Sequence, residues 1–225
     1  MIKLVDKIPS GITPSCAAAV RAISLFNAYN GYNIALFWSQ TNDNGTTAFI
    51  SRMDGDITVF ATDTADLYEI AQFIKTVCAS SVLSNVPLPL KGEVAVTQLT
   101  ASGEVFCDYT CSLSTAYEIM STCFAMPDFD VWYADMSHRV RHGAAVVRCS
   151  DASAACGLIA NGSALVVGLC TMPDSRKGGK ATEVLNQLKQ LGCNLFVLAE
   201  DEIVRFYVNR NFEISGKHYI YNGDV

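Results

Sequence analysis

A short glycine-bearing turn between a buried strand and a helix carries the clearest chemical signal in the sequence. Residues 163–171 (SALVVGLCT) are almost continuously apolar, the segment 176–180 reads RKGGK, and apolar residues recur at helical spacing over 179–191. A helix N-terminus offers unpaired N–H groups and the positive end of the macrodipole, and glycines let a phosphate approach the backbone closely. The turn therefore predicts a diphosphate site. The alternative is an ordinary turn whose lysines only face solvent.

Two other phosphate-binding motifs do not fit the chain. The nucleotide-binding pattern G-x-x-x-x-G-K-[ST] matches at Gly179-Lys180, but Asp174 stands at its first glycine position and Ala181 replaces its Ser/Thr. No G-x-G-x-x-G follows a predicted strand, which argues against a dinucleotide-binding fold.

Several side chains could act as a general base. His138 and His142 are four apart within residues 138–149, which read as a strand, so both would point to one face. Histidine titrates near neutral pH, although a structural or solvent-facing role is the simpler interpretation for each. Asp135 is a further candidate with no better claim.

The elements that would position these groups follow the same order in both halves of the chain. In the first half we expect a helix over 16–29, strands over 33–40, 47–53 and 56–61 with an Asp54-Gly55 hairpin, and a helix over 67–78. In the second half we expect a helix over 113–124, a strand or helical turn over 131–135, strands over 138–149, 154–160 and 163–171, a helix over 179–191, a strand over 193–199, a helix over 201–210 and a strand over 212–221. The shared order indicates an internal duplication. Pro87, Pro89 and Gly92 make 86–104 the expected linker.

Composition narrows the class of protein. Half of the 225 residues are apolar and 17% are charged, which predicts a packed globular chain, and the net charge of -6 argues against nucleic acid as a partner. The apolar runs are far shorter than a membrane span, and the N-terminus does not resemble a signal peptide, so we expect a cytoplasmic protein without membrane contact. The nine cysteines lack C-x-x-C pairs and an export signal, so we expect no metal, no disulfide framework and mostly small buried thiols.

At this point the sequence resembles the GNAT superfamily of acyl-CoA-dependent N-acyltransferases. The segment 176–181 (RKGGKA) fits the superfamily's pyrophosphate signature Gln/Arg-x-x-Gly-x-Gly/Ala, and 206–212 (FYVNRNF) is similar to its Phe-Tyr-x-x-x-Gly-Phe segment. The resemblance covers roughly residues 108–225. It implies an α/β (α+β) chain with a mixed, mostly antiparallel sheet flanked by helices. The expected domains are 1–100, a degenerate GNAT-like or interaction domain, and 105–225, a GNAT acetyltransferase domain.

The resemblance also implies roles for individual residues. Acetyl-CoA would be the cosubstrate, and the residues expected to bind it are Leu169, Cys170, Thr171, Arg176, Lys177, Gly178, Gly179, Lys180 and Ala181. Tyr207 would be the general acid, unless it is a core tyrosine. Glu200 would be the base, unless it only caps a helix with Asp201. An asparagine that contacts the cofactor often stands near this position in the family, so Glu200 departs from that pattern.

The acceptor is implied only in outline. Trp132 and Tyr133 lie where acceptor-binding residues often occur in the family, although core packing is the simpler role for both. His138 is a further candidate for the acceptor site. The acceptor would be a primary amine of a small molecule or a protein, and the acidic composition favours a cationic amine. A non-catalytic acyl-CoA-binding or sensing protein is the alternative function, and a homodimer is compatible with either.

Overall fold

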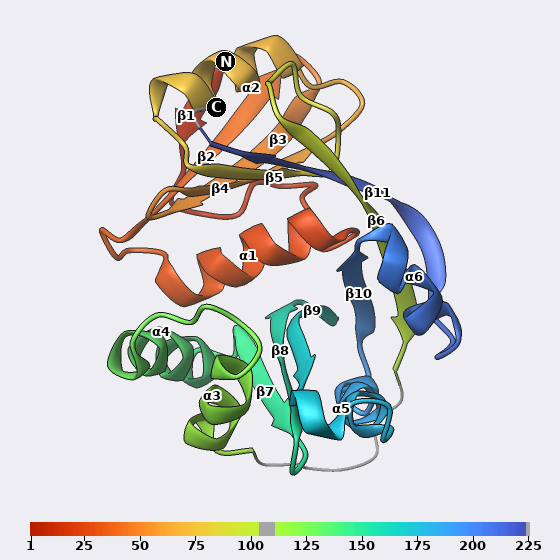
Figure 1. Cartoon of the computed structure of the whole chain (residues 1–225). Helices are drawn as coiled ribbons and strands as arrows, with labels where there is room; N and C mark the ends of the chain where they lie inside the picture. The colour runs from red at the N-terminus through yellow and green to blue at the C-terminus, as the bar shows by residue number, and fades with distance from the viewer. Residues whose placement is uncertain (104–110, 224–225) are drawn as a thin grey trace.

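The computed structural model describes residues 1–103 and 111–223. This part of the chain forms one mixed, mostly antiparallel sheet of eleven strands flanked by helices, as expected (Figure 1). The strands are β1 (Ile2–Leu4), β2 (Ala35–Asn42), β3 (Gly45–Met53), β4 (Asp56–Ala61), β5 (Ser81–Ser84), β6 (Glu93–Ser102), β7 (Ala145–Cys149), β8 (Ser153–Ala160), β9 (Ser163–Thr171), β10 (Asn194–Ala199) and β11 (Glu213–Asn222). The helices are α1 (Ala17–Tyr29), α2 (Leu67–Thr76), α3 (Leu113–Ser121), α4 (Phe129–Arg141), the 3-10 turn η1 (Pro173–Ser175), α5 (Lys180–Lys189) and α6 (Asp201–Val208). None of the described helices is long and apolar enough to span a membrane.

The two halves of the sheet share strands. The strand order is β1-β2-β3-β4-β5-β11-β6-β10-β9-β8-β7. The C-terminal strand β11 therefore lies between β5 and β6, and β6 lies between β11 and β10, so each half's last strand pairs with the other half. Among the described strands, β4–β5 and β9–β10 are the pairs that run in parallel, one in each half. This repeated arrangement supports the predicted duplication, while the exchange of β6 and β11 crosses the division expected near residues 100–105.

Helix α1 lies between the two halves (Figure 1). Eleven of its thirteen residues are buried, and its many alanines let strands from both halves approach closely. It shares one core with α3, α4 and the facing strands of both halves, whereas α5 and α6 cover the outer face of the second half and α2 that of the first. Arg21 is its one charged residue.

The N-terminus of α1 is capped by the exchanged strands. Ala17 N–H donates to Gln98 Oε1 of β6 (2.7 Å), and Ala18 N–H donates to His218 Nε2 of β11 (3.2 Å). Its own N-cap residue, Cys16, makes no side-chain cap. Both cap side chains are buried, so the central helix is fixed to the strands that join the halves.

The expected linker over 86–104 is wrong for its second part, because residues 93–102 are the central strand β6. The proline and glycine signals mark only the loop before it. Its partners β10 and β11 lie about a hundred residues away, so no local signal reveals the pairing. The short strands β1 and β5 were not predicted either.

The strand expected over 138–149 is also wrong at its start. Helix α4 runs to Arg141, and Gly143, with φ +66°, reverses the chain before β7. Trp132 and Met136 are buried at i, i+4 spacing, which is a helical period. His138 lies on α4 and His142 is its C-cap, with ring centroids 4.1 Å apart, so the two rings do share a face, but that of a helix.

Candidate active site

Strands β9 and β10 pair over only part of their length. Their parallel pairing runs from Ser163 and Asn194 to Val166 and Val197, whereas β9 continues to Thr171 along β8. Just beyond the last pair, Gly168 adopts φ +63° where the register with β8 shifts, which is a β-bulge. A Cβ there would lie 2.7 Å from Met120 Cε. The pairing of β9 with β10 therefore ends just before the bulge.

The turn after β9 leaves the N-terminus of α5 without a cap. Gly179 is the N-cap residue, with φ +81° and no side-chain hydrogen bond. Within the described part of the chain, the backbone N–H groups of residues 177–181 have no hydrogen-bond acceptor. Five successive N–H groups at a helix N-terminus form a site with strong affinity for an anion.

A cavity of about 580 Å³ joins the end of β9 to this helix terminus. We call it the α5 cavity. It is lined by all the residues expected to bind acetyl-CoA except Gly178, which lies within the same turn. It is also lined by residues that the sequence analysis did not assign: Cys123, Phe124, Ser175, Thr182, Glu202, Ile203, Phe206 and Arg210. Most come from α6 and from the α3–α4 connection, which only the fold brings to the end of β9.

The cations of the turn differ in how far protein carboxylates engage them. Lys180 Nζ pairs with Asp151 (2.7 Å) and lies 3.7 Å from Glu183; hydrogen bonding to Lys180 lowers the pKa of Asp151. The Arg176 side chain donates from Nε to the Thr171 carbonyl at 3.4 Å, and no carboxylate among the described residues forms an ion pair with it. Arg176 therefore remains available for an anion at the end of α5.

Tyr207 lines the α5 cavity, whereas Glu200 does not. The Tyr207 ring is buried against Phe206 and Phe212, and burial raises the pKa of its phenol to about 12. No described residue hydrogen-bonds its hydroxyl, which leaves the phenol protonated and unengaged at the cavity wall. Glu200 is the exposed N-cap residue of α6, and the acidic side chain that does line the cavity is Glu202.

The expected acceptor residues lie apart from one another. Trp132 lines a second cavity, between the halves. Tyr133 is 42% exposed, and His138 Nε2 lies 2.8 Å from the Ala28 carbonyl. A carbonyl only accepts, so this nitrogen carries the proton, and the ring stacks on Tyr29. Neither Tyr133 nor His138 lines either cavity, and Asp135, the other base candidate, is engaged by Arg139 at 2.9 and 3.0 Å.

The position in the first half that is equivalent to the α5 site is closed. After β5, the Asn85 side chain hydrogen-bonds both backbone groups of Ala61 at 2.8 Å, which extends the β4–β5 pairing. Helix α2 is capped by Asp66, which accepts from Glu69 N–H. A carboxylate at the helix start repels an anion. Among the described residues, this half therefore has neither the gap nor the run of five free N–H groups found at α5.

Comparison with solved structures identifies the fold. A GCN5-related N-acetyltransferase from Sphaerobacter thermophilus superposes with a TM-score of 0.56 at 10% identity, covering 97% of this chain and 94% of that one. A GNAT-family acetyltransferase from Novosphingobium aromaticivorans gives 0.54 at 13% identity, covering 92% and 99%. A tandem GNAT protein from the clavulanic acid biosynthesis pathway gives 0.53 at 8% identity, covering 98% of each chain.

The chain has a tandem GNAT fold. This confirms the fold inferred from the RKGGKA and FYVNRNF segments and extends it over the first half, where no motif was found. No protein-family profile and no curated protein sequence matches the chain. The GNAT fold therefore rests on three-dimensional similarity, and at this level of identity it does not establish an activity.

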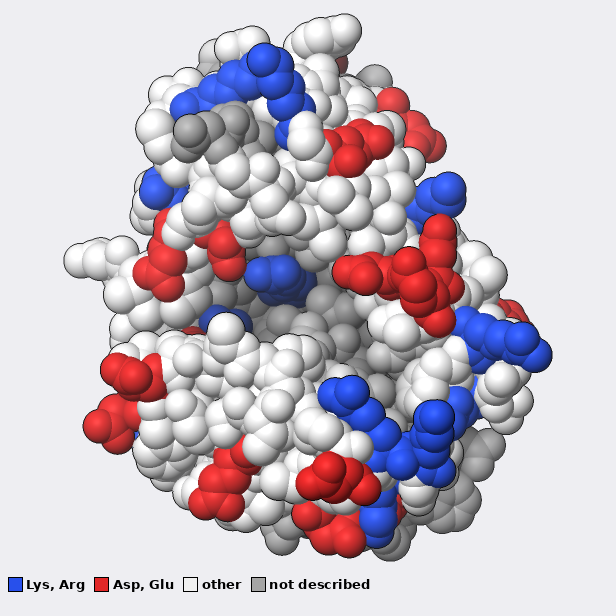
Figure 2. Space-filling view, viewed as in Figure 1, with Lys and Arg blue, Asp and Glu red and all other residues white. Residues whose placement is uncertain are grey.

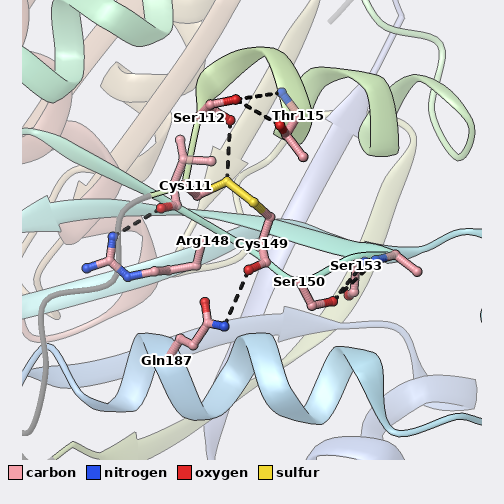
Figure 3. Close-up of a disulfide and its surroundings, with 10 residues drawn as sticks. Cys111, Ser112, Thr115, Arg148, Cys149, Ser150, Ser153 and Gln187 are labelled. Carbon is pink, nitrogen blue, oxygen red and sulfur yellow. Dashed lines mark hydrogen bonds between the residues drawn. A yellow bond between two sulfur atoms is a disulfide. The ribbon is translucent and has the colours of Figure 1, made fainter.

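One pair of cysteines in this GNAT fold forms a disulfide, contrary to expectation. Cys111, just before α3, is bonded to Cys149 at the end of β7 (Figure 3). Of the six free cysteines in the described residues, only Cys156 and Cys170 are buried; Cys107 lies outside those residues. Disulfides are rare in the reducing cytosol, so the bond is in tension with the predicted cytoplasmic location. The described residues contain no cluster of side chains suited to a metal ion.

We expect unreduced, denatured protein to gain two further alkylated cysteines after treatment with a reductant. Peptide mapping should assign the new labels to Cys111 and Cys149. Cys123, which lies near Thr171 in the α5 cavity, serves as the internal control, because it should react without reduction. Full alkylation of both Cys111 and Cys149 before reduction would contradict the bond.

Proposed function

We propose that the protein transfers an acetyl group from acetyl-CoA to a primary amine. The observation that carries this proposal is the uncapped N-terminus of α5, with unpaired N–H groups over residues 177–181. It opens on a cavity that also reaches the bulged end of β9. A helix terminus of this kind suits a diphosphate, and a diphosphate is the part of acetyl-CoA that needs such a site.

The residues of the α5 cavity fit the parts of the cosubstrate. The N–H groups of 177–181 and the Arg176 guanidinium would hold the diphosphate. Leu169, Cys170 and Thr171, at the end of β9, would bind the pantetheine arm and orient the thioester by backbone hydrogen bonds. Tyr207 would stand at the reacting end of the cavity.

Acetyl transfer requires attack by the amine on the thioester, departure of the thiolate and two proton transfers. The neutral amine nitrogen bonds to the thioester carbonyl carbon, the carbon–sulfur bond breaks, and the nitrogen loses a proton to water or a carboxylate. The departing thiolate receives a hydrogen bond from the Tyr207 phenol. Because burial raises the pKa of that phenol to about 12, above that of an ordinary thiol, Tyr207 stabilises the thiolate chiefly by hydrogen bonding, and the proton itself can come from water.

The test is calorimetric titration of acetyl-CoA and CoA into wild-type protein and an Arg176→Ala, Lys180→Ala double variant. We expect micromolar binding by the wild type and a loss of at least about tenfold in the variant, since charge-assisted hydrogen bonds to phosphate are removed. Arg205→Ala, Lys217→Ala is the matched control, because it removes the same charge from residues that line neither cavity.

Three outcomes separate the possibilities. Equal losses in both double variants would show that net charge, and not the turn, governs binding. No binding by wild type would overturn the proposed activity. Binding without turnover of any amine would favour an acyl-CoA-binding protein on the same scaffold.

A further inference from the structure

A second cavity, of about 550 Å³, lies between the halves of the molecule. We call it the Arg21 cavity. Its walls come from α1 and the β3–β4 hairpin of the first half and from α4, β8 and β9 of the second. A hollow between the halves, with basic surface at its floor and acidic surface on either side, is visible in Figure 2. No sequence motif marked this cavity.

The Arg21 guanidinium lines this cavity with hydrogen-bonding capacity that the described residues leave unfilled. It is the one charged residue of a helix that is otherwise nearly all buried, and its side chain is 39% exposed. Its nearest carboxylate oxygen, on Asp56, is 3.8 Å away, beyond hydrogen-bond length. None of its guanidinium N–H groups has a hydrogen-bond acceptor among the described residues. A guanidinium with free donors matches the two oxygens of a carboxylate.

The other charges in the cavity limit what can bind there. Arg139 Nε donates to both carboxylate oxygens of Asp135, and Arg139 Nη2 lies 3.3 Å from Met53 Sδ. With Asp135 engaged in this way, the carboxylates that remain beside Arg21 are those of Asp54 and Asp56 at the hairpin. A phosphate dianion would meet two carboxylates and a polyamine would meet a guanidinium, whereas a molecule with one carboxylate and one ammonium group complements both signs.

The rest of the lining is apolar and leads towards the reacting strand. Leu25, Trp132, Leu158 and Val167 line the Arg21 cavity. Val167 stands two residues before Leu169, which lines the α5 cavity, and two residues of a strand span about 7 Å. The two cavities therefore have neighbouring residues of β9 in their walls.

We propose that the Arg21 cavity binds an amino acid with an apolar side chain, whose carboxylate is held by Arg21. Given the proposed acetyl transfer, on which this role depends, the amino acid is the acceptor. Its α-ammonium group would lose one proton to water or a carboxylate, and the neutral amine would attack the thioester at the end of β9. The new carbon–nitrogen bond would replace the carbon–sulfur bond, the nitrogen would lose a second proton, the thiolate would take up a proton, and the products would be an N-acetyl amino acid and CoA.

The test compares amino acids with their amides, which keep the side chain and the amine but lack the carboxylate. Binding of L-leucine, L-methionine and L-phenylalanine, and of the three amides, is measured by saturation-transfer NMR titration without acetyl-CoA. We expect at least one acid to bind about tenfold or more tightly than its amide, since the amide loses a charge-assisted hydrogen bond. Arg21→Gln should weaken that acid to the level of its amide, and Arg21→Lys should restore only part of the preference.

Two further variants exclude a merely structural role for Arg21. Arg141→Gln, at the exposed end of α4 and outside both cavities, should leave acid binding unchanged. Asp56→Asn removes the partner of Arg21 and should keep the preference for the acid. If Arg21 only held Asp56, Arg21→Gln and Asp56→Asn would lower the Tm alike, and wild type would not distinguish acid from amide.

Absence of binding by all three acids, equal affinity for acid and amide, or an unchanged preference in Arg21→Gln would each overturn the inference. Titration of acetyl-CoA into the same samples separates it from the proposed function. Arg21-dependent binding of an acid by protein that does not bind acetyl-CoA would leave the amino-acid site standing and remove the acetyl transfer. If the protein acetylates other amines but shows no preference for an amino acid over its amide, the acetyl transfer would stand and the amino-acid site would be removed.

Discussion

Tyr207→Phe is expected to lower kcat for acetyl transfer by about a hundredfold and to leave the affinity for acetyl-CoA unchanged. The substitution removes one oxygen atom from a ring that is held between Phe206 and Phe212, so the packing of α6 remains. What is lost is the hydrogen bond to the departing sulfur, and removal of one donor to a charge that develops in the transition state typically costs about 10²–10³ in rate. The measurement is steady-state kinetics together with calorimetric titration of acetyl-CoA.

Tyr68→Phe is the matched control, since Tyr68 is 75% exposed on α2 and lies outside both cavities. Because the pKa of the Tyr207 phenol is about 12, the wild-type rate should show no fall caused by its ionisation below about pH 10. Equal kcat in Tyr207→Phe and wild type would remove Tyr207 from the mechanism and reduce it to a core residue.

Lowering the pH from 7 to 4 is expected to cost about 3 kcal/mol of folding stability through His218 alone. Its Nε2 accepts from the Ala18 N–H at the start of α1, so only the neutral ring fits, and burial lowers its pKa from 6.5 to about 4. Between these values the unfolded chain binds a proton that the folded chain does not. Stability therefore falls as the pH drops, by about 1.4 kcal/mol for each pH unit.

Urea unfolding at pH 7 and pH 4, in wild type and His218→Gln, measures this contribution. Glutamine offers an amide oxygen to the same N–H but does not titrate, so the variant should lose about 2–3 kcal/mol less over the interval. Carboxylates that titrate near pH 4 affect both proteins alike and cancel in the comparison. Parallel losses in the two proteins would show that His218 does not cap α1 in its neutral form.

The fold is predicted most reliably from the sequence where a local residue pattern alone determines the element. The apolar run at 163–171 coincides with β9, and the glycine turn that follows does begin a helix. Both signals are contained in a short stretch of sequence. Burial on two faces makes a strand continuously apolar, and a glycine such as Gly179 stands at a helix start because the backbone turns there with positive φ. The α5 cavity could be outlined for the same reason, because most of its wall is one continuous segment.

The sequence fails where function depends on contacts between distant segments. Residues 93–102 have proline and glycine before them and no partner nearby, yet they form β6. Arg21 could be noticed only as a lone charge in an alanine-rich helix, and its cavity exists because α4 and the β3–β4 hairpin meet beside it. Trp132 was assigned to the acceptor site together with Tyr133 and His138, but the helix α4 turns the other two away from the cavity.

The exchange of β6 and β11 has a consequence for synthesis of the protein on the ribosome. The first half leaves the ribosome with β5 and β6 made, but the strand that lies between them, β11, is translated after the whole of the second half up to α6. Until then β5 lacks a partner on one side, and α1 lacks the His218 half of its N-terminal cap. The sheet of the first half therefore keeps an open edge, which is prone to wrong pairing. That edge is covered only when β11 pairs with β5, after about 120 further residues have been translated.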